Sequence, residues 1–288
     1  MPGQVRATPD VGSTGASDAQ GRAATLAVFG DWPYSLDLVA VAPLLIGSVN
    51  SDPDVSAVIH VGDIHSGSMP CTGAGLNPRP AGSNPIWNYG VFGLFAQFNA
   101  PFVYTPGDNE WTDCHKTKQF SSGAPLNELA AVRQLFFPEA GVTLGGAPMH
   151  VLSQAQVSDP AHPTDAEFIE NTMWRQANVV FVTLNVPGSN NDGLPWTSPF
   201  TDETARLAEV AKRNGANTRW LQRAFQLASQ VQAQGVLIAL QADMWDPAAL
   251  LPNGDGLGGY TGFVRTLAGL AISFNRPVLL INGDSHTF

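Results

Sequence analysis

The sequence is poor in positive charge. Its 288 residues contain 14 lysines and arginines against 24 aspartates and glutamates, which gives a formal net charge of −10. Proteins that bind nucleic acids need clustered cations to displace the counterions of the phosphates. The composition therefore argues against a nucleic-acid partner.

The sequence also lacks a long hydrophobic run. No segment approaches the roughly 18 consecutive apolar residues that a membrane-spanning helix needs, and the N-terminus lacks the basic and then apolar order of a secretory signal. We therefore expect a soluble chain without a membrane span, which is compatible with a mature form whose signal has been removed.

The length allows one large domain with a sizeable core. Residues 1–22 are small and polar with no apolar period, so they are predicted to be a tail or linker before a single domain over residues 23–288. From Ala23 onward, short apolar runs alternate with longer segments of helical period, which is typical of a layered α/β fold. The predicted strands are 25–30, 57–62, 102–106, 178–186, 236–241 and 277–282, and the predicted helices are 36–49, 85–98, 126–137, 202–212, 217–233 and 260–274.

Two segments are predicted to be long loops. Residues 65–85 and 138–177 are rich in glycine, proline, asparagine and serine. Long loops in compact domains are often functional lids. Their sequences do not indicate a particular substrate.

Four predicted strands end in a Gly-Asp pair, at Asp31, Asp63, Asp108 and Asp284. A single aspartate of this kind is typical of a turn or a helix N-cap. In an open α/β sheet, however, the carboxyl ends of the strands converge on one crevice. Carboxylates brought together there raise one another's pKa unless a cation compensates their charge. The pattern therefore predicts a metal site rich in oxygen ligands.

The order of these motifs resembles that of the calcineurin-like metallophosphoesterases. It runs strand-GD, strand-GD, strand-GDNE, strand-polar and strand-GDSH, and it extends from about Ala23 to the last residue. The resemblance implies a four-layered α/β/β/α sandwich with two central mixed sheets and two divalent metal ions. Members of the family usually continue with further strands after the last motif, so it also implies either a minimal member or a sequence that is cut short after Phe288.

The resemblance also implies metal ligands. Asp31 matches the first-metal aspartate, and Asp63 matches the aspartate that bridges both ions. A bridging carboxylate of this kind holds two metal ions about 3.5–4 Å apart. Asp108 falls on the second-metal asparagine of the family. The remaining matched positions are Gln241 or Asp243 for the histidine after the fourth strand, Asp284 for the second-metal histidine and His286 for the first-metal histidine.

Several positions depart from the family pattern. Pro33 stands where the family often has a histidine ligand, and His65 is a candidate to supply that imidazole or else a turn residue in solvent. Asn109 stands where the family has the histidine that protonates the leaving group, and an amide cannot transfer a proton at neutral pH. His115 is the nearest replacement, or else a surface loop residue. His65 and a metal-bound water are further candidates to supply the proton. The loss of histidines to oxygen ligands favours Mg²⁺, Mn²⁺, Ca²⁺ or iron over Zn²⁺.

Residues beside these motifs have two interpretations each. Glu110 either accepts hydrogen bonds that orient the metal site or is a carboxylate in the first turn of a helix. Trp32, Tyr34 and Trp111 either line a pocket or cap the core. His60 lies inside a strand and is predicted to be a packed core residue.

The two cysteines, Cys71 and Cys114, each follow a motif aspartate closely. If the second and third strands are neighbours, as the family order implies, a disulfide between them would join the two loops at the rim of the site. A disulfide predicts a periplasmic or extracellular location, with the signal removed, although the sequence leaves a cytoplasmic location open.

These features together predict a hydrolase for a small phosphate monoester or diester that uses a water activated by two metal ions. A metallohydrolase of another ester, or a nuclease, is compatible with the same centre. A further alternative is a non-catalytic module that binds metal or phosphate, because the histidines of the first and third motifs are missing. The sequence does not indicate the oligomeric state.

Overall fold

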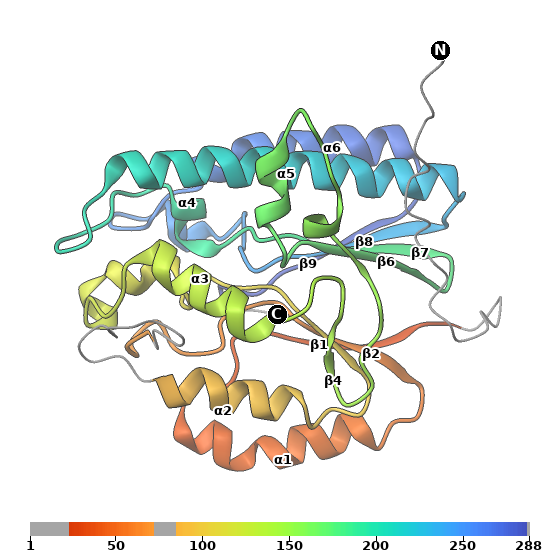
Figure 1. The fold of residues 1–288 in the computed structure, drawn as a ribbon, viewed down its shortest axis with the longest axis horizontal. Helices are drawn as coiled ribbons and strands as arrows, with labels where there is room; N and C mark the ends of the chain where they lie inside the picture. The colour runs from red at the N-terminus through yellow and green to blue at the C-terminus, as the bar shows by residue number, and fades with distance from the viewer. Residues whose placement is uncertain (1–22, 72–84, 287–288) are drawn as a thin grey trace.

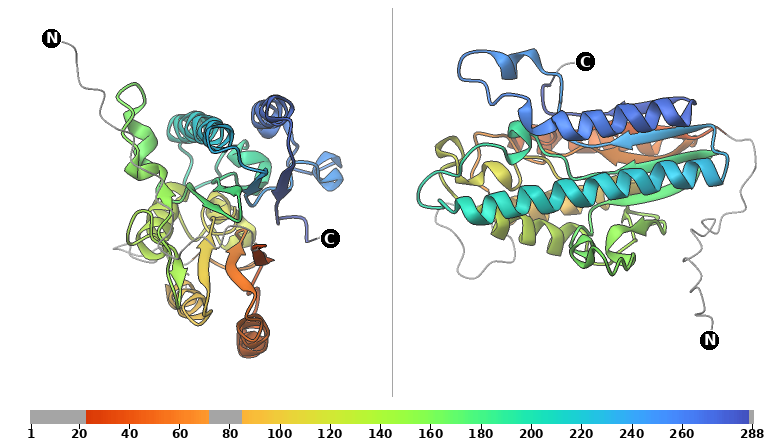
Figure 2. Two further views of the ribbon diagram at one scale, coloured as in Figure 1. Left: turned by 90° about the vertical axis from the view of Figure 1, so that its right-hand side faces the viewer. Right: turned by 90° about the horizontal axis from the view of Figure 1, so that it is seen from above.

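The computed structural model describes residues 23–71 and 85–286 of the chain. These residues form two β-sheets and six α-helices, whose arrangement is shown in Figures 1 and 2. The predicted tail, residues 1–22, and residues 72–84 of the first predicted loop lie outside the described part.

The first sheet has the strand order β1-β2-β3-β4. Its strands are β1 (Thr25–Phe29), β2 (Val55–His60), β3 (Pro101–Tyr104) and β4 (Leu144–Gly145). The first three are parallel and β4 is antiparallel to β3. The carboxyl ends of β1, β2 and β3 therefore lie at the same edge of this sheet.

The second sheet has the order β5-β6-β7-β8-β9. Its strands are β5 (Leu152–Ser153), β6 (Thr172–Gln176), β7 (Val179–Thr183), β8 (Gly235–Ala239) and β9 (Val278–Ile281). The last three are parallel, and the first two pairings are antiparallel. The predicted α/β class and the two mixed sheets are confirmed.

Helices lie on both sides of the pair of sheets (Figure 1). On one side are α1 (Leu36–Asn50) and α2 (Pro85–Phe95), and on the other are α5 (Glu203–Gln230) and α6 (Thr261–Phe274). Two more helices, α3 (Pro125–Phe136) and α4 (Gly188–Asp192), follow β3 and β7 in the chain. Short 3₁₀ helices span Thr112–His115, Thr117–Gln119, Gln154–Gln156, Pro163–Glu167, Pro247–Leu250 and Gly258–Tyr260. None of the described helices is long and apolar enough to cross a bilayer.

The alternation of side chains along the strands explains how these parts pack. Successive residues of a strand point to opposite faces of its sheet. In β2, Val58 packs among residues of α1 and α2, whereas Ile59 packs against residues of the second sheet. In β7, Phe181 packs between the sheets, and Val182 packs against α5 and α6. Both sheets are thus apolar on both faces, as the continuous apolar runs in the sequence indicate.

The prediction of two separate helices over 202–212 and 217–233 is wrong, because one helix, α5, runs through both segments. Gly215 in the predicted gap costs the helix only about 1 kcal/mol relative to alanine. Buried interactions of the helix lie on both sides of it. Arg213 forms an ion pair with Glu209 at 2.8 Å, and Asn217 donates to the carbonyl oxygen of Asn185 at 2.8 Å.

The prediction of an irregular segment over 138–177 is also wrong in part, because β4, β5 and β6 lie there. The β6 segment is short and lies among turn residues, so its own pattern is weak. It is held by its neighbour instead. Trp174 is opposite Phe181 of β7, and the two rings stack with centroids 4.9 Å apart.

Candidate metal centre

Three of the motif aspartates occupy an unusual backbone conformation. Asp31, Asp63 and Asp284 have φ angles of 53°, 60° and 77°, in the left-handed region. Aspartate tolerates this region better than most residues, because its short side chain can form local hydrogen bonds. The turns are also tied together by backbone hydrogen bonds, from the Asp31 N–H to the Gly62 oxygen at 3.0 Å and from the Gly283 N–H to the Gln241 oxygen at 2.9 Å.

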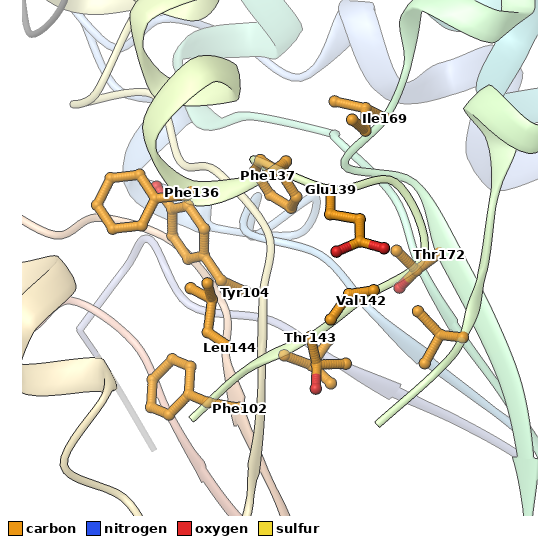
Figure 3. A pocket seen from close by; sticks show the side chains of 13 residues that line it. Phe102, Tyr104, Phe136, Phe137, Glu139, Val142, Thr143, Leu144, Ile169 and Thr172 are labelled. Carbon is orange, nitrogen blue, oxygen red and sulfur yellow. The ribbon is translucent and has the colours of Figure 1, made fainter. Parts of the chain in front are cut away.

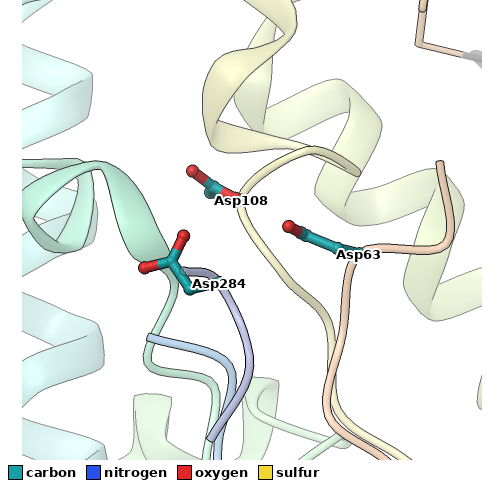
Figure 4. A group of neighbouring side chains, drawn as sticks. All are labelled: Asp63, Asp108 and Asp284. Atoms are coloured by element: carbon teal, nitrogen blue, oxygen red, sulfur yellow. The ribbon is translucent and has the colours of Figure 1, made fainter. Parts of the chain in front are cut away.

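Asp63, Asp108 and Asp284 converge, and Figure 4 shows their side chains facing one another. Each has a carboxylate oxygen within 4.8 Å of one from each of the other two. Asp63 is only 2% exposed and Asp108 only 6%. These residues come from strand ends of both sheets, as the sequence predicts, and the group could hold a metal ion.

The electrostatics of this group favour the binding of protons or of a cation. Burial, followed by repulsion from neighbouring carboxylates, raises the pKa of Asp63 well above its ordinary value. Burial and repulsion from Asp108 raise the pKa of Asp284 to about 8. Burial and Asp113 also raise the pKa of Asp108. A cation bound among the three would remove this penalty, so the donor set fits a hard metal ion.

Gly188 closes the group from the side of α4. A Cβ atom at this position would lie 2.6 Å from Asp284 Oδ1 and 2.9 Å from Asp108 Oδ2. Both distances are shorter than a non-bonded carbon and oxygen allow. Only glycine therefore lets the backbone approach the two carboxylates this closely.

Asp31 and His286 form a second group beside Asp63. The Nε2 atom of His286 lies 3.1 Å from Asp31 Oδ1. Burial raises the pKa of Asp31, and the charge of His286 opposes that shift. The hydroxyl of Tyr34 lies between these residues, 3.0 Å from Asp31 Oδ1, 3.1 Å from Asp63 Oδ2 and 3.1 Å from His286 Nε2. The structure therefore brings both predicted first-metal residues to the bridging aspartate, together with a tyrosine that the sequence only suggested as a pocket wall.

Gln241 lies in the group, and Asp243 lies beside it. The Gln241 Nε2 donates to Asp63 Oδ2 at 3.2 Å and to Asp108 Oδ1 at 3.1 Å, while its Oε1 accepts from the Gly188 N–H. Asp243 instead donates its backbone N–H to Asp284 Oδ2 at 3.1 Å, and its carboxylate accepts the Trp245 N–H at 3.0 Å. Of the two candidates, Gln241 has the side chain that contacts the aspartates, and it does so through its nitrogen.

Asn109 holds the bridging aspartate. Its Nδ2 donates to Asp63 Oδ2 at 3.0 Å, and its backbone N–H donates to Asp63 Oδ1 at 3.2 Å. Its Oδ1 accepts from Gln119 Nε2 at 3.0 Å, which fixes the orientation of the amide. Asn109 can thus orient Asp63, but it has no proton to give to a leaving group at neutral pH.

The two histidine candidates for proton transfer are engaged elsewhere. His65 is fully buried, with Nδ1 3.2 Å from the Ser66 oxygen. His115 accepts the Thr197 N–H on Nδ1 at 2.9 Å. Burial lowers the pKa of both rings to about 4, so both are neutral at physiological pH. Within the described residues, neither ring is hydrogen-bonded to a motif aspartate, so the structure does not bring them into the group.

Glu110 supports the turn of the second motif. Its Oε1 accepts the Ile64 N–H at 3.1 Å and the Tyr104 hydroxyl at 2.8 Å. Burial raises its pKa to about 7. These contacts match the interpretation in which Glu110 accepts hydrogen bonds that orient the site, rather than the one in which it is a first-turn helix carboxylate. Trp111, by contrast, is a buried core residue.

Ser189, for which no functional role was predicted, also contacts the group. Its Oγ lies 2.7 Å from Asp108 Oδ2 and 2.6 Å from Asp113 Oδ1, and Lys116 Nζ donates to it at 2.8 Å. Ser189 begins four consecutive residues with φ between 51° and 60°, the left-handed turn 189–192. The only sequence signal was a cluster of turn-forming residues, which is common in ordinary loops.

The predicted disulfide between Cys71 and Cys114 is present, with 5.6 Å between the two Cα atoms. Both cysteines are buried, and the Cys71 Sγ lies 3.3 Å from the Asn109 carbonyl oxygen. The bridge therefore supports the loop that holds Asn109. It is compatible with the expected periplasmic or extracellular location.

Two hollows lie away from the aspartates. One, of about 20 Å³, is lined by Phe102, Tyr104, Phe136 and neighbouring residues (Figure 3), and it has room for about one water molecule. The other, of about 480 Å³, lies where β7, β8 and β9 begin, at the opposite end of the strands, and none of its described lining residues is titratable. The smaller hollow includes one carboxylate, Glu139, but has no room for a substrate.

No protein-family model matches the chain, and no curated protein matches it significantly. Function is therefore inferred from the chemistry of the side chains that converge at the strand ends.

Proposed function

We propose that the chain is a metal-dependent phosphoester hydrolase that uses a water activated by two metal ions. The observation that carries this proposal is the meeting of Asp63, Asp108 and Asp284, with Asp31 and His286 beside Asp63. The two mixed sheets, with helices on both outer sides, support the four-layered α/β/β/α sandwich of the calcineurin-like metallophosphoesterases.

The proposed centre has two parts that share Asp63. Asp63, Asp108 and Asp284 would hold one ion, and Asp31, Asp63 and His286 the other. Carboxylate oxygens outnumber imidazoles, which favours Mg²⁺, Mn²⁺, Ca²⁺ or iron over Zn²⁺. When bound, such ions polarise phosphate oxygens and lower the pKa of a coordinated water towards neutrality.

The protein's own contribution is orientation. The amides of Asn109 and Gln241 both donate to Asp63 Oδ2, so they hold this carboxylate in one position. The backbone at Gly188 covers Asp108 and Asp284. This preorganisation fixes the ligands before substrate binds, which is the main requirement for phosphoryl transfer.

The substrate class follows from the missing proton donor. Asn109 cannot protonate a leaving oxygen, and His65 and His115 are hydrogen-bonded away from the aspartates. Leaving groups that depart as stable anions, such as aryl oxides, need no such proton. We therefore favour small phosphate monoesters and diesters with good leaving groups.

The test is hydrolysis of aryl phosphate monoesters and diesters by the purified chain with excess Mn²⁺ or Mg²⁺. We expect turnover to be lost in Asp63→Asn and kept in Asp54→Asn, since Asp54 is an exposed aspartate before β2. Equal rates for wild type and Asp63→Asn would remove the hydrolase proposal. Carboxylic esters and nucleic acids in the same assay separate a phosphoesterase from another metallohydrolase or a nuclease.

A second candidate is a non-catalytic module that binds metal or phosphate. The presence of Asn109 and Pro33 at family histidine positions favours it. Metal analysis separates the two: two bound ions per chain with turnover support the enzyme, whereas bound phosphate or at most one ion without turnover supports the module.

A further inference from the structure

The loop between β8 and α6, residues 243–259, begins and ends at the proposed metal centre. At its start, the Asp243 N–H donates to Asp284 Oδ2 at 3.1 Å. At its end, the Gly259 N–H donates to Asn190 Oδ1 at 2.7 Å, in the left-handed turn beside the aspartates. Figure 2 shows this segment, in blue, projecting from the body of the fold. The loop 243–259 therefore borders the site.

Contacts of the loop give it a defined shape. The Gly256 N–H donates to the Ala249 carbonyl oxygen at 2.9 Å, and Pro247–Leu250 form a 3₁₀ helix. Lys116 Nζ pairs with Asp255 Oδ2 at 3.2 Å, which attaches the second half of the loop to the segment after the third motif. A surface that is already ordered loses little conformational freedom when it binds a ligand.

Three large apolar side chains of this loop are exposed. Trp245 is 54% exposed, Leu250 69% and Leu251 63%. The adjacent Met244 is only 3% exposed and packs in the core, so the loop buries one of its apolar residues and leaves these three in solvent. Single exposed apolar residues are common on protein surfaces, whereas a group of them marks an interaction site.

The position of Trp245 indicates what this surface contacts. Its N–H donates to Asp243 Oδ1 at 3.0 Å, and the Asp243 N–H donates to Asp284. Two residues span at most about 7 Å, so the Trp245 nitrogen lies within about 10 Å of Asp284 Oδ2. A phosphoester whose phosphate binds at the aspartates must extend its organic group away from them. The exposed indole is therefore close enough to meet that group.

The charge of the loop restricts the chemistry of the organic group. Residues 243–259 include three aspartates and no lysine, arginine or histidine. An anionic group, such as a second phosphate, would be repelled there. An uncharged apolar group, by contrast, is stabilised when it leaves water for an apolar surface. The loop therefore fits an uncharged aromatic or aliphatic group.

We propose that the loop 243–259 selects the substrate, and that Trp245 contacts an uncharged apolar group attached to the phosphate. This inference rests on the proposed function, because the phosphate must bind at the aspartates. An aromatic side chain offers such a group a large and rigid apolar face. The substrate class narrows from small phosphoesters in general to those with an uncharged apolar organic group.

The test compares phosphonates, which have one organic group and are not hydrolysed. Calorimetry measures the binding of phenylphosphonate, methylphosphonate and phosphonoacetate to the full chain loaded with Mn²⁺. We expect wild type to bind phenylphosphonate at least about tenfold more tightly than methylphosphonate. Phosphonoacetate, whose organic group is anionic, should bind no more tightly than methylphosphonate. Trp245→Ala should reduce the preference for phenyl over methyl at least about fivefold.

Two variants serve as controls. Tyr89 lies on α2 and is 51% exposed, so Tyr89→Ala removes an equally exposed aromatic ring and should keep the preference. Trp245→Phe retains an aromatic ring and should keep most of it. Because the preference is a ratio within one sample, partial loss of folded protein does not change it. An equal preference in wild type and Trp245→Ala would overturn the inference, as would wild type that binds neither phosphonate.

Turnover of aryl phosphates, measured on the same samples, separates this inference from the proposed function. A preference that depends on Trp245 without turnover removes the hydrolase and keeps the selective loop. Turnover without such a preference does the reverse. Vesicles of phosphatidylcholine test the other apolar partner. Vesicle binding that Trp245→Ala abolishes, without a preference for phenylphosphonate, would overturn the inference and assign the loop to a lipid surface.

Discussion

At the scale of single residues, the centre combines strain with unbalanced charge. Asp31, Asp63 and Asp284 have positive φ angles, and His286 has a φ of 56°. Residues held in such conformations cost of order 1–3 kcal/mol each and cluster at functional sites. Here the positive φ angles direct acidic side chains from separate strands towards one another. The resulting burial and repulsion raise the pKa values of Asp31, Asp63 and Asp284.

Asp284 leads to a prediction about pH. Its pKa is about 8 in the folded chain, against an ordinary 3.8. Above about pH 7.5, one unit above their ordinary pKa, the histidines are neutral in both folded and unfolded states. Between there and about pH 9 the folded chain keeps a decreasing fraction of the proton on Asp284 that the unfolded chain has lost. The metal-free protein should therefore lose stability as pH rises, by up to about 1.4 kcal/mol per pH unit for this proton.

Urea unfolding in EDTA across this pH range measures the effect. Asp284→Asn should show a smaller slope than wild type, with part of the slope left by Glu110, whose pKa is about 7. Excess Mn²⁺ should also reduce the wild-type slope, because the ion favours the ionised carboxylate. Identical slopes for wild type and Asp284→Asn would contradict the account.

Gly188 leads to a second prediction. In Gly188→Ala the new methyl group would meet Asp284 Oδ1 at 2.6 Å, so the carboxylates must move apart. We expect Mn²⁺ affinity, measured by calorimetry, to fall about tenfold or more. Gly269→Ala is the control, since a Cβ there in α6 has no neighbour within 4 Å. An unchanged affinity in Gly188→Ala would show that the close approach is not needed.

At the scale of elements, the left-handed turn 189–192 is the most unusual segment of the site. Left-handed backbone costs about 1–2 kcal/mol for each residue that is not glycine. Contacts from other elements stabilise the turn. Ser189 contacts Asp108, the Gly259 N–H donates to Asn190 Oδ1 at 2.7 Å, and Arg213 of α5 donates to the side chain and the carbonyl oxygen of Asn191.

Arg213 is expected to couple α5 to the metal centre through this turn. It is fully buried, pairs with Glu209 and lies over the Trp111 ring at 5.3 Å. Removing one partner of a buried ion pair costs about 3–5 kcal/mol. Arg213→Ala should lose stability by that order in urea unfolding and should bind Mn²⁺ more weakly. Arg265→Ala, which alters an exposed arginine of α6, should do neither. Full metal affinity in a folded Arg213→Ala protein would remove the coupling.

At the scale of the whole molecule, two sheets meet so that their strand ends form one site. Asp31, Asp63 and Asp108 follow strands of the first sheet, and Gln241 and Asp284 follow strands of the second. The apolar core between the sheets, which includes Ile59 and Phe181, therefore sets the distance between the two halves of the proposed metal centre. Global stability and metal binding should change together.

The disulfide allows a test of global stability. It joins residues separated by 43 positions, and closing a loop of that length stabilises the fold by about 4 kcal/mol in the chain-entropy model. The double variant Cys71→Ala and Cys114→Ala should lose about that much in urea unfolding. Reductant should destabilise wild type by a similar amount and leave the double variant unchanged. A double variant as stable as wild type would contradict the prediction.

Much of the fold was predictable where local pattern and packing agree. The apolar runs that became β2, β7 and β8 are largely buried on both faces, so most of their residues are apolar. The β6 segment and the continuity of α5 at Gly215 were not predictable, because contacts with distant residues stabilise them. For the site, the Gly-Asp pairs identified the aspartates, whereas the sequence around Tyr34 and Ser189 did not indicate that their hydroxyls contact these aspartates.

The chain's own residue order establishes which residues are acidic, which segments are buried and that aspartates follow strand ends. These properties depend on composition and on patterns that repeat every few residues, so they can be recognised from residues that are close together in the sequence. The choice of Gln241 over Asp243, the position of the Tyr34 hydroxyl between three groups and the distance of His65 and His115 from the aspartates depend on folding. Each is set by atoms that are brought together across the two sheets, and a shift of 1 or 2 Å, about the length of one bond, would change which of them can hold an ion.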